Sequence, residues 1–197
     1  MMNTRRRVRG AERRGAKRRR GEEVRRRRGV LASSPPHLPA SSTLLLGIGN
    51  RLCSDDGLGG AVIELIQARY HLPAGVVARD GGTLGLHLLP DLEGVEQLII
   101  IDAIQRDQPP GTIVRLEETQ LPTALSPKLS LHQCGLGELL ALATALDMRP
   151  ARIILWGIVP ASTAPGLDMS PVVAAQLEVL IDAIVKDAGI AASVKLC

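Results

Sequence analysis

The segment that most constrains the fold of this chain runs from residue 43 to residue 60 and reads TLLLGIGNRLCSDDGLGG. An apolar run at residues 44–48 stops at a glycine-rich turn, and two adjacent carboxylates, Asp55 and Asp56, follow just before a predicted helix. In α/β proteins, such a strand and turn present polar groups at the carboxyl edge of a parallel sheet. The segment therefore predicts an α/β fold with a polar site at that edge.

Strand-like and helix-like segments alternate through the rest of the chain. Strands are predicted at residues 43–48, 75–79, 97–101, 112–116 and 152–159, and helices at 57–70, 84–92, 136–146 and 170–187, the last with Ser170 as N-cap and Pro171 in the first turn. Residues 97–101 (QLIII) predict a central strand buried on both faces, whereas residues 112–116 alternate like an edge strand. This order predicts a twisted, mostly parallel sheet of about five strands with helices on both faces.

The charges divide the chain into two segments. Residues 1–28 carry 14 Lys and Arg against 3 Asp and Glu, a net charge of +11, and the remainder carries 10 basic and 17 acidic residues, a net charge of −7. Residues 1–42 are Arg-rich and then Ser/Pro-rich, so we expect a disordered tail before a folded domain at 43–197. The tail is interpreted as a solvated extension or an upstream start codon, or else as an arm for nucleic acid or an acidic partner.

Composition argues against several classes of protein. The sequence contains no Phe, one Trp and one Tyr, which counts against base stacking on single-stranded nucleic acid, so no nucleic acid is expected on the folded domain. No apolar run is long enough for a membrane span, and the arginines are not followed by the apolar region of a secretory signal. Three cysteines without C-x-x-C spacing suit a reduced cytoplasm, and Cys53 and Cys134 are interpreted as small apolar fillers outside any metal shell.

Polar residues follow the predicted strands, where they are expected to meet at one crevice. Asp56 follows the first strand, Asp80 the second and Asp102 the third, while His132 precedes a predicted helix. Two carboxylates and an imidazole would make a site for a borderline metal ion. Asp102 is the strongest candidate, because a carboxylate beside such apolar residues must be paired or coordinated.

Each candidate also has a purely structural interpretation. Either Asp55 or Asp56 would serve as a helix cap, and Asp80, before Gly-Gly-Thr, would serve as an Asx-turn. His37, His71 and His87 are assigned structural roles, and composition alone leaves His132 undecided. The turn Gly47-Ile48-Gly49-Asn50-Arg51-Leu52 has leucine where a dinucleotide-binding fingerprint has its third glycine, so a nucleotide site is only weakly indicated.

Four blocks of sequence together resemble the hydrogenase maturation endopeptidases. They are Gly47-Ile48-Gly49-Asn50 with Ser54-Asp55-Asp56-Gly57-Leu58-Gly59, then Asp80-Gly81-Gly82-Thr83 with Gly85 and Leu88-Leu89, then Ile101-Asp102-Ala103, and Ser130-Leu131-His132-Gln133. The resemblance extends from about residue 44 to the last predicted helix. It implies a three-layer α/β/α sandwich and an enzyme that removes the C-terminal extension of a nickel-iron hydrogenase large subunit after nickel insertion.

The resemblance also implies which residues act. The family's metal-contacting residues correspond to Asp56, Asp102 and His132, which are expected to contact nickel carried by the large-subunit precursor. Asp80 is a further candidate for substrate recognition or proton transfer. A cytoplasmic monomer is expected. Two alternatives are kept: a metabolite- or nucleotide-binding α/β module, which predicts nucleotide affinity without metal, and a nucleic-acid adaptor using the tail, which predicts salt-sensitive binding.

Overall fold

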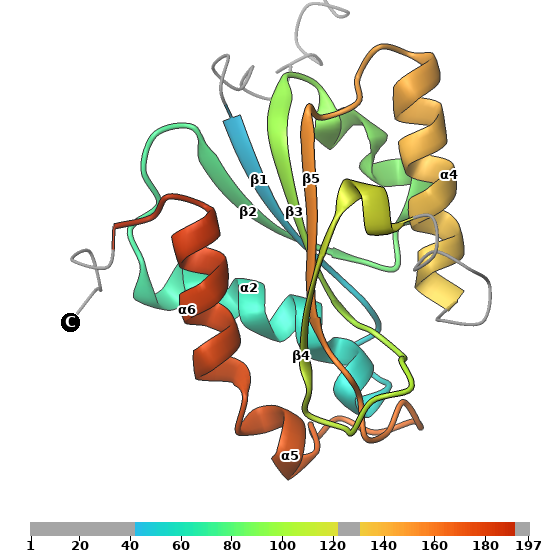
Figure 1. Cartoon of the computed structure of the whole chain (residues 1–197), viewed down its shortest axis with the longest axis vertical. Helices are drawn as coiled ribbons and strands as arrows, with labels where there is room; N and C mark the ends of the chain where they lie inside the picture. Colours follow the sequence, from blue (N-terminus) through green and yellow to red (C-terminus); the bar gives the residue numbers. More distant parts are fainter. Residues whose placement is uncertain (1–41, 122–130, 192–197) are drawn as a thin grey trace, which may run out of the picture. The chain divides into compact units, whose positions relative to one another are not determined.

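The computed structural model describes residues 42–121 and 131–191, with side chains described from residue 135 onward in the second range. The expected tail, apart from Ser42, therefore lies outside the described residues. Five strands form one sheet in the order β2-β1-β3-β5-β4 (Figure 1). They are β1 (Ser42–Ile48), β2 (Val76–Gly82), β3 (Val95–Ala103), β4 (Ile113–Glu117) and β5 (Arg152–Ile158). The pairs β2-β1, β1-β3 and β3-β5 are parallel. Strand β4 is an edge strand, as predicted, and it pairs with β5 in the antiparallel direction.

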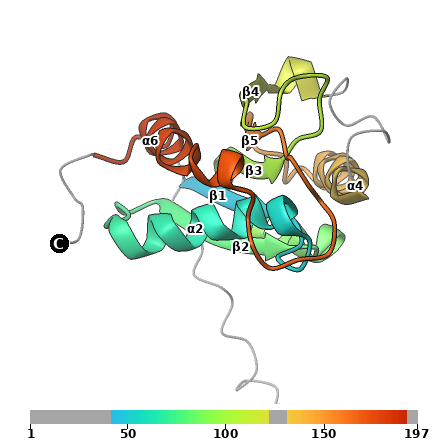
Figure 2. The same ribbon diagram turned by 90° about the horizontal axis from the view of Figure 1, so that it is seen from below.

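The helices cover both faces of the sheet. The elements besides the strands are the 3₁₀ turns η1 (Ser54–Gly57), η2 (Gly85–Leu92) and η3 (Glu118–Gln120) and the helices α2 (Leu58–Arg69), α4 (Leu131–Ala145), α5 (Pro171–Ala174) and α6 (Leu177–Asp187). Figure 2 shows α2 and α6 on one side of the sheet and α4 on the other. This arrangement confirms the expected α/β/α sandwich.

Two aliphatic cores follow from the alternation of side chains along the strands. Leu44, Leu46 and Leu98 pack against η2 and α4 on one face, whereas Leu45 and Ile99 pack against α2 and α6 on the other. Leucine, isoleucine, valine and alanine supply most of both cores, in keeping with the scarcity of aromatic residues. Positions 98–101 of β3 are fully buried, which confirms the prediction of a central strand covered on both faces.

Several element boundaries differ from those predicted. Strand β2 continues through Asp80-Gly81-Gly82, a sequence that predicts a turn, because this segment still pairs with β1 through a register shift at Gly47 and Ile48. Strand β3 includes Asp102, which pairs with Gly157 of β5. The last predicted helix is two helices, α5 and α6, with Ala175 and Gln176 between them.

Candidate functional site

The turn after β1 requires glycine at two positions. A Cβ atom on Gly47 would lie 2.3 Å from the carbonyl oxygen of Gly59, so glycine allows β1 and α2 to approach closely. Gly49 has φ +127°, and a Cβ there would lie 1.9 Å from the carbonyl oxygen of Asp56. The N–H of Gly49 donates to the carbonyl of Gly82 at 3.0 Å, which joins the turn to the end of β2. The backbone around Gly49 is therefore fixed from both sides.

Asp56 lies in η1 and returns to this turn. Its side chain is buried, and its Oδ2 accepts a hydrogen bond from the N–H of Asn50 at 2.9 Å. The contact spans six residues of chain and closes the loop between β1 and α2. This bond holds the Asp56 carboxylate against the turn at the carboxyl end of β1.

Asp102 reaches the same turn from the neighbouring strand. It is the next-to-last residue of β3 and is fully buried, and its Oδ1 accepts from the N–H of Ala103 at 2.8 Å. The same Oδ1 lies 3.7 Å from where a Cβ of Gly49 would stand. Because Gly49 and Asn50 are consecutive, the structure brings the carboxylates of Asp56 and Asp102 to one glycine turn.

His132 is placed by its backbone alone. It lies in the first turn of α4, which begins at Leu131 and not near residue 136 as predicted, so His132 is part of the helix and does not precede it. Its side chain lies outside the described residues. Among the side chains that the structure describes, no three His, Cys, Asp or Glu residues gather as a metal site.

Asp80 points to a different set of partners. Its Oδ1 accepts from the N–H of Gly82 at 3.0 Å, which is the contact of an Asx-turn. Its Oδ2 accepts from Nε of Arg51 at 3.1 Å, and Arg51 also pairs with Glu64 at 2.8 Å. Asp80 is thus engaged by the end of its own strand and by Arg51.

Asp55 is the residue whose role sequence reasoning left open. It is fully buried, and its carboxylate accepts hydrogen bonds from the N–H groups of Ala161 (2.8 Å), Ser162 (3.0 Å) and Ser170 (2.6 Å) and from the Ser170 hydroxyl (2.9 Å). Burial by itself raises the pKa of Asp55, but these hydrogen bonds outweigh it and hold the pKa below its usual value. Asp55 fastens the loop after β5 to η1.

This clamp changes the expected role of Ser170. Ser170 is the N-cap of α5, as predicted, and Pro171 lies in the first turn of that helix. The hydroxyl, however, makes no capping bond and donates to Asp55. No local signal in the sequence could have identified this pair, because the two residues are 115 positions apart.

The two other histidines that the structure describes, and the described cysteine, lie outside this arrangement. His37 and the side chain of Cys134 lie outside the described residues. His71 and His87 are exposed, so neither fills the core. Cys53 is half-buried, carries a free thiol and pairs with Gly166 through an isolated β-bridge. Within the described ranges no helix has both the length and the apolar character needed to cross a membrane.

Comparison with known proteins points to one group. The family model for hydrogenase maturation proteases matches residues 61–187. The hydrogenase 2 maturation protease of Escherichia coli is 37% identical over 136 residues, which covers 68% of this chain and 83% of that protein.

Two solved structures extend the similarity to the fold. The hydrogenase maturating endopeptidase HybD from E. coli superposes with a TM-score of 0.71 at 34% identity, covering 76% of this chain and 94% of that one. The [NiFe] hydrogenase maturation protease HybD from Thermococcus kodakarensis has a TM-score of 0.65 at 29% identity, covering 75% and 99%.

Proposed function

This chain belongs to the hydrogenase maturation protease family, and from that membership we propose that it is the endopeptidase that removes the C-terminal extension of a nickel-iron hydrogenase large subunit after nickel insertion. The substrate is the nickel-loaded large-subunit precursor. The nickel is cargo of that precursor, and the enzyme recognises it there. Family membership does not favour the alternative of a nucleotide- or metabolite-binding module.

The observation that carries the proposal is the meeting of Asp56 and Asp102 at the Gly49-Asn50 turn. Both carboxylates are buried at the carboxyl edge of the sheet, and each is oriented by a backbone N–H. Carboxylate oxygens are among the ligands that hold divalent metal ions in proteins. Two oriented carboxylates at one turn therefore suit a cation that arrives with the substrate.

We assign Asp56, Asp102 and His132 as the residues that contact this nickel. Imidazole is a good ligand for nickel, and cysteine thiolates of the precursor would supply soft ligands. A bound metal ion can polarise a carbonyl or activate a water. The side chains of this enzyme would hold the precursor with its scissile bond beside the turn, so cleavage would depend on prior nickel insertion. We propose Asp80 as an aid to recognition or proton transfer.

A cleavage assay with two forms of the precursor tests this function. The purified protein should shorten the nickel-loaded large subunit, seen as a mobility shift, and leave the nickel-free subunit intact. Asp102→Asn and His132→Ala should each abolish the shift. Matched controls are Asp147→Asn and His71→Ala, which change exposed residues elsewhere and should cleave normally. Full processing by Asp102→Asn or His132→Ala would refute the assignment. We further propose that the enzyme acts as a cytoplasmic monomer.

A further inference from the structure

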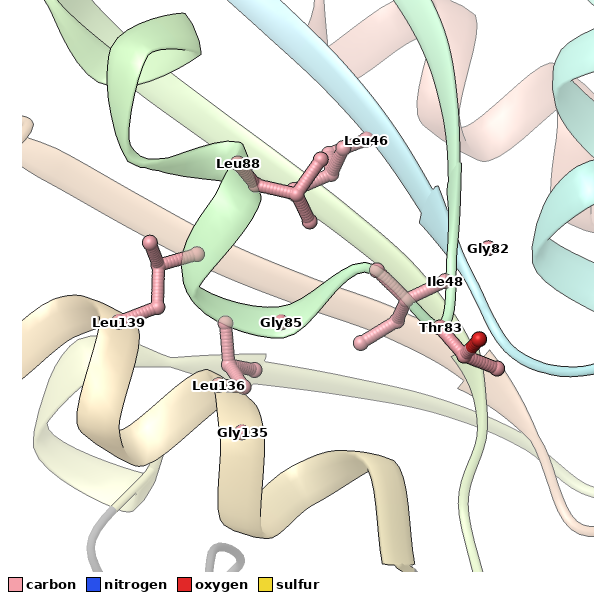
Figure 3. A pocket seen from close by; sticks show the side chains of 9 residues that line it. All are labelled: Leu46, Ile48, Gly82, Thr83, Gly85, Leu88, Gly135, Leu136 and Leu139. Carbon is pink, nitrogen blue, oxygen red and sulfur yellow. The ribbon is translucent and has the colours of Figure 1, made fainter.

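An apolar pocket adjoins the turn that holds Asp56 and Asp102. It occupies about 100 Å³ between η2 and α4, and its lining includes Ile48, Gly85, Leu88, Gly135, Leu136 and Leu139 (Figure 3). Figure 3 shows Leu136 and Leu139 pointing from α4 toward η2. Leu88, Leu136 and Leu139 are almost completely buried, so they form fixed walls.

The pocket is continuous with the candidate site through the backbone. Ile48 lines the pocket and directly precedes Gly49, whose position abuts the Asp102 carboxylate. Gly82, also in the lining, accepts the hydrogen bond from the N–H of Gly49 at 3.0 Å. If a peptide binds at the two carboxylates, the side chain of a nearby residue of that peptide would therefore reach the pocket.

Glycines keep one side of the pocket open. A Cβ atom built on Gly82 or Gly85 would meet no atom within 4 Å, and one on Gly135 would meet only Cα of Gly85 at 3.5 Å. Leu84 and Leu86, on either side of Gly85, are 47% and 45% exposed. This surface is apolar and accessible, which is typical of a site that binds apolar side chains.

We propose that this pocket is a specificity subsite that takes one aliphatic side chain of the precursor, at a residue flanking the scissile bond. This inference rests on the proposed function. An engineered apolar cavity of about 150 Å³ holds benzene, so a cavity of about 100 Å³ suits a single leucine, isoleucine or valine side chain. Apart from Thr83 and the glycines, the lining side chains are aliphatic and none is charged, so a charged side chain would be desolvated there without an ionic partner.

Filling the pocket from Gly135 tests the proposal. Gly135→Leu projects a side chain toward Gly85, and Gly135→Ala narrows the same space with little risk to folding, since alanine favours the helix. Gly137→Leu and Gly137→Ala are matched controls on the same helix, because a Cβ on Gly137 meets no atom within 4 Å and Gly137 does not line the pocket.

The assay measures kcat/KM on nickel-loaded precursors in which each residue flanking the scissile bond is varied among leucine, valine, alanine and aspartate. Wild-type enzyme should lose activity as the side chain at one of these positions shrinks, by about 10- to 200-fold for each methylene removed. Gly135→Leu should lose activity on the aliphatic substrates and recover relative activity on the alanine substrate. The Gly137 variants should keep the wild-type order.

The outcomes separate this proposal from the function itself. If wild-type enzyme leaves every nickel-loaded precursor uncut, the proposed function fails and the subsite fails with it. If wild-type enzyme cuts the precursors with a kcat/KM that does not depend on side-chain size at either residue flanking the scissile bond, only the subsite is refuted. An unchanged preference in both Gly135 variants also refutes the subsite alone.

Discussion

The carboxylate of Asp55 accepts a hydrogen bond from the hydroxyl of Ser170, 115 residues further along the chain, at 2.9 Å. Three backbone N–H groups of the same loop donate to this carboxylate as well. Asp56, the next residue, is part of the candidate site, where its carboxylate accepts a hydrogen bond from the N–H of Asn50. The clamp on Asp55 thus fixes the segment from which Asp56 reaches its turn.

Removing the charge of Asp55 should destabilise the protein. Hydrogen bonds to charged groups contribute about 1.5–3 kcal/mol each, and a buried donor left unpaired is costly. We expect Asp55→Asn to lower the free energy of unfolding by about 2–4 kcal/mol, measured by urea denaturation. Ser162→Ala is the control, since its hydroxyl accepts only one exposed bond, from Ala164, and the change should stay within about 0.5 kcal/mol. A loss in Asp55→Asn no larger than in this control would contradict the clamp.

The same carboxylate predicts a dependence of stability on acid. The pKa of Asp55 in the folded protein is lowered from 3.8, so its contribution to stability is complete above that value. As the pH falls through 3.8 toward the folded pKa, this contribution is lost. Unfolding free energies measured between pH 6 and pH 2.5 should fall more steeply for wild-type protein than for Asp55→Asn. Parallel curves would show that Asp55 does not titrate with folding.

Gly49 should not tolerate any side chain. A Cβ would collide with the carbonyl of Asp56, and φ +127° is a conformation that almost only glycine adopts. Gly49→Ala should therefore abolish precursor cleavage and lower the unfolding free energy by more than about 3 kcal/mol. Gly189→Ala, also at positive φ but with open space around its Cβ, should cost only about 1–2 kcal/mol and keep full activity. Equal effects in the two variants would rule out the steric explanation.

Asp80→Asn should separate folding from function. The amide oxygen of asparagine can still accept from Gly82, and the ion pair with Arg51 is half-exposed, so we expect stability to change by less than about 1 kcal/mol. If Asp80 aids recognition or proton transfer, kcat/KM on nickel-loaded precursor will fall at unchanged melting temperature. Normal cleavage would restrict Asp80 to its Asx-turn.

Much of the fold was predictable because β1, β3 and β5 each contain a run of aliphatic residues. The periodicity of apolar residues and the residue composition of each segment predicted all five strands. The alternation in residues 112–116 identified the edge strand. The same patterns failed where glycine occurs inside a regular element. Gly82 remains in β2 because it pairs with Ile48 of β1 across a register shift that skips Gly81. Gly135 and Gly137 lie inside α4, where the packing of Leu136 and Leu139 outweighs their poor helix propensity.

The candidate site was less accessible to sequence reasoning. The predicted order of strands placed Asp56 and Asp102 at one edge of the sheet. The neighbouring sequence, however, does not show which of the adjacent Asp55 and Asp56 belongs to the site and which has a structural role. The structure separates them through Asp55, whose partners come from the loop after β5. Partners more than 100 residues apart leave no periodic signal. The role of His132 stays a prediction, since its side chain lies outside the described part of the chain.

The antiparallel course of β4 has a consequence for the carboxyl edge of the sheet. Because β4 runs back along β5, the connection from β3 begins and ends on the edge where Asp102 lies, and its residues 105–110 are exposed. A parallel strand would have required a crossover to the far edge. Insertions at 105–110 would therefore reshape the surroundings of the proposed site while leaving every ladder of the sheet intact.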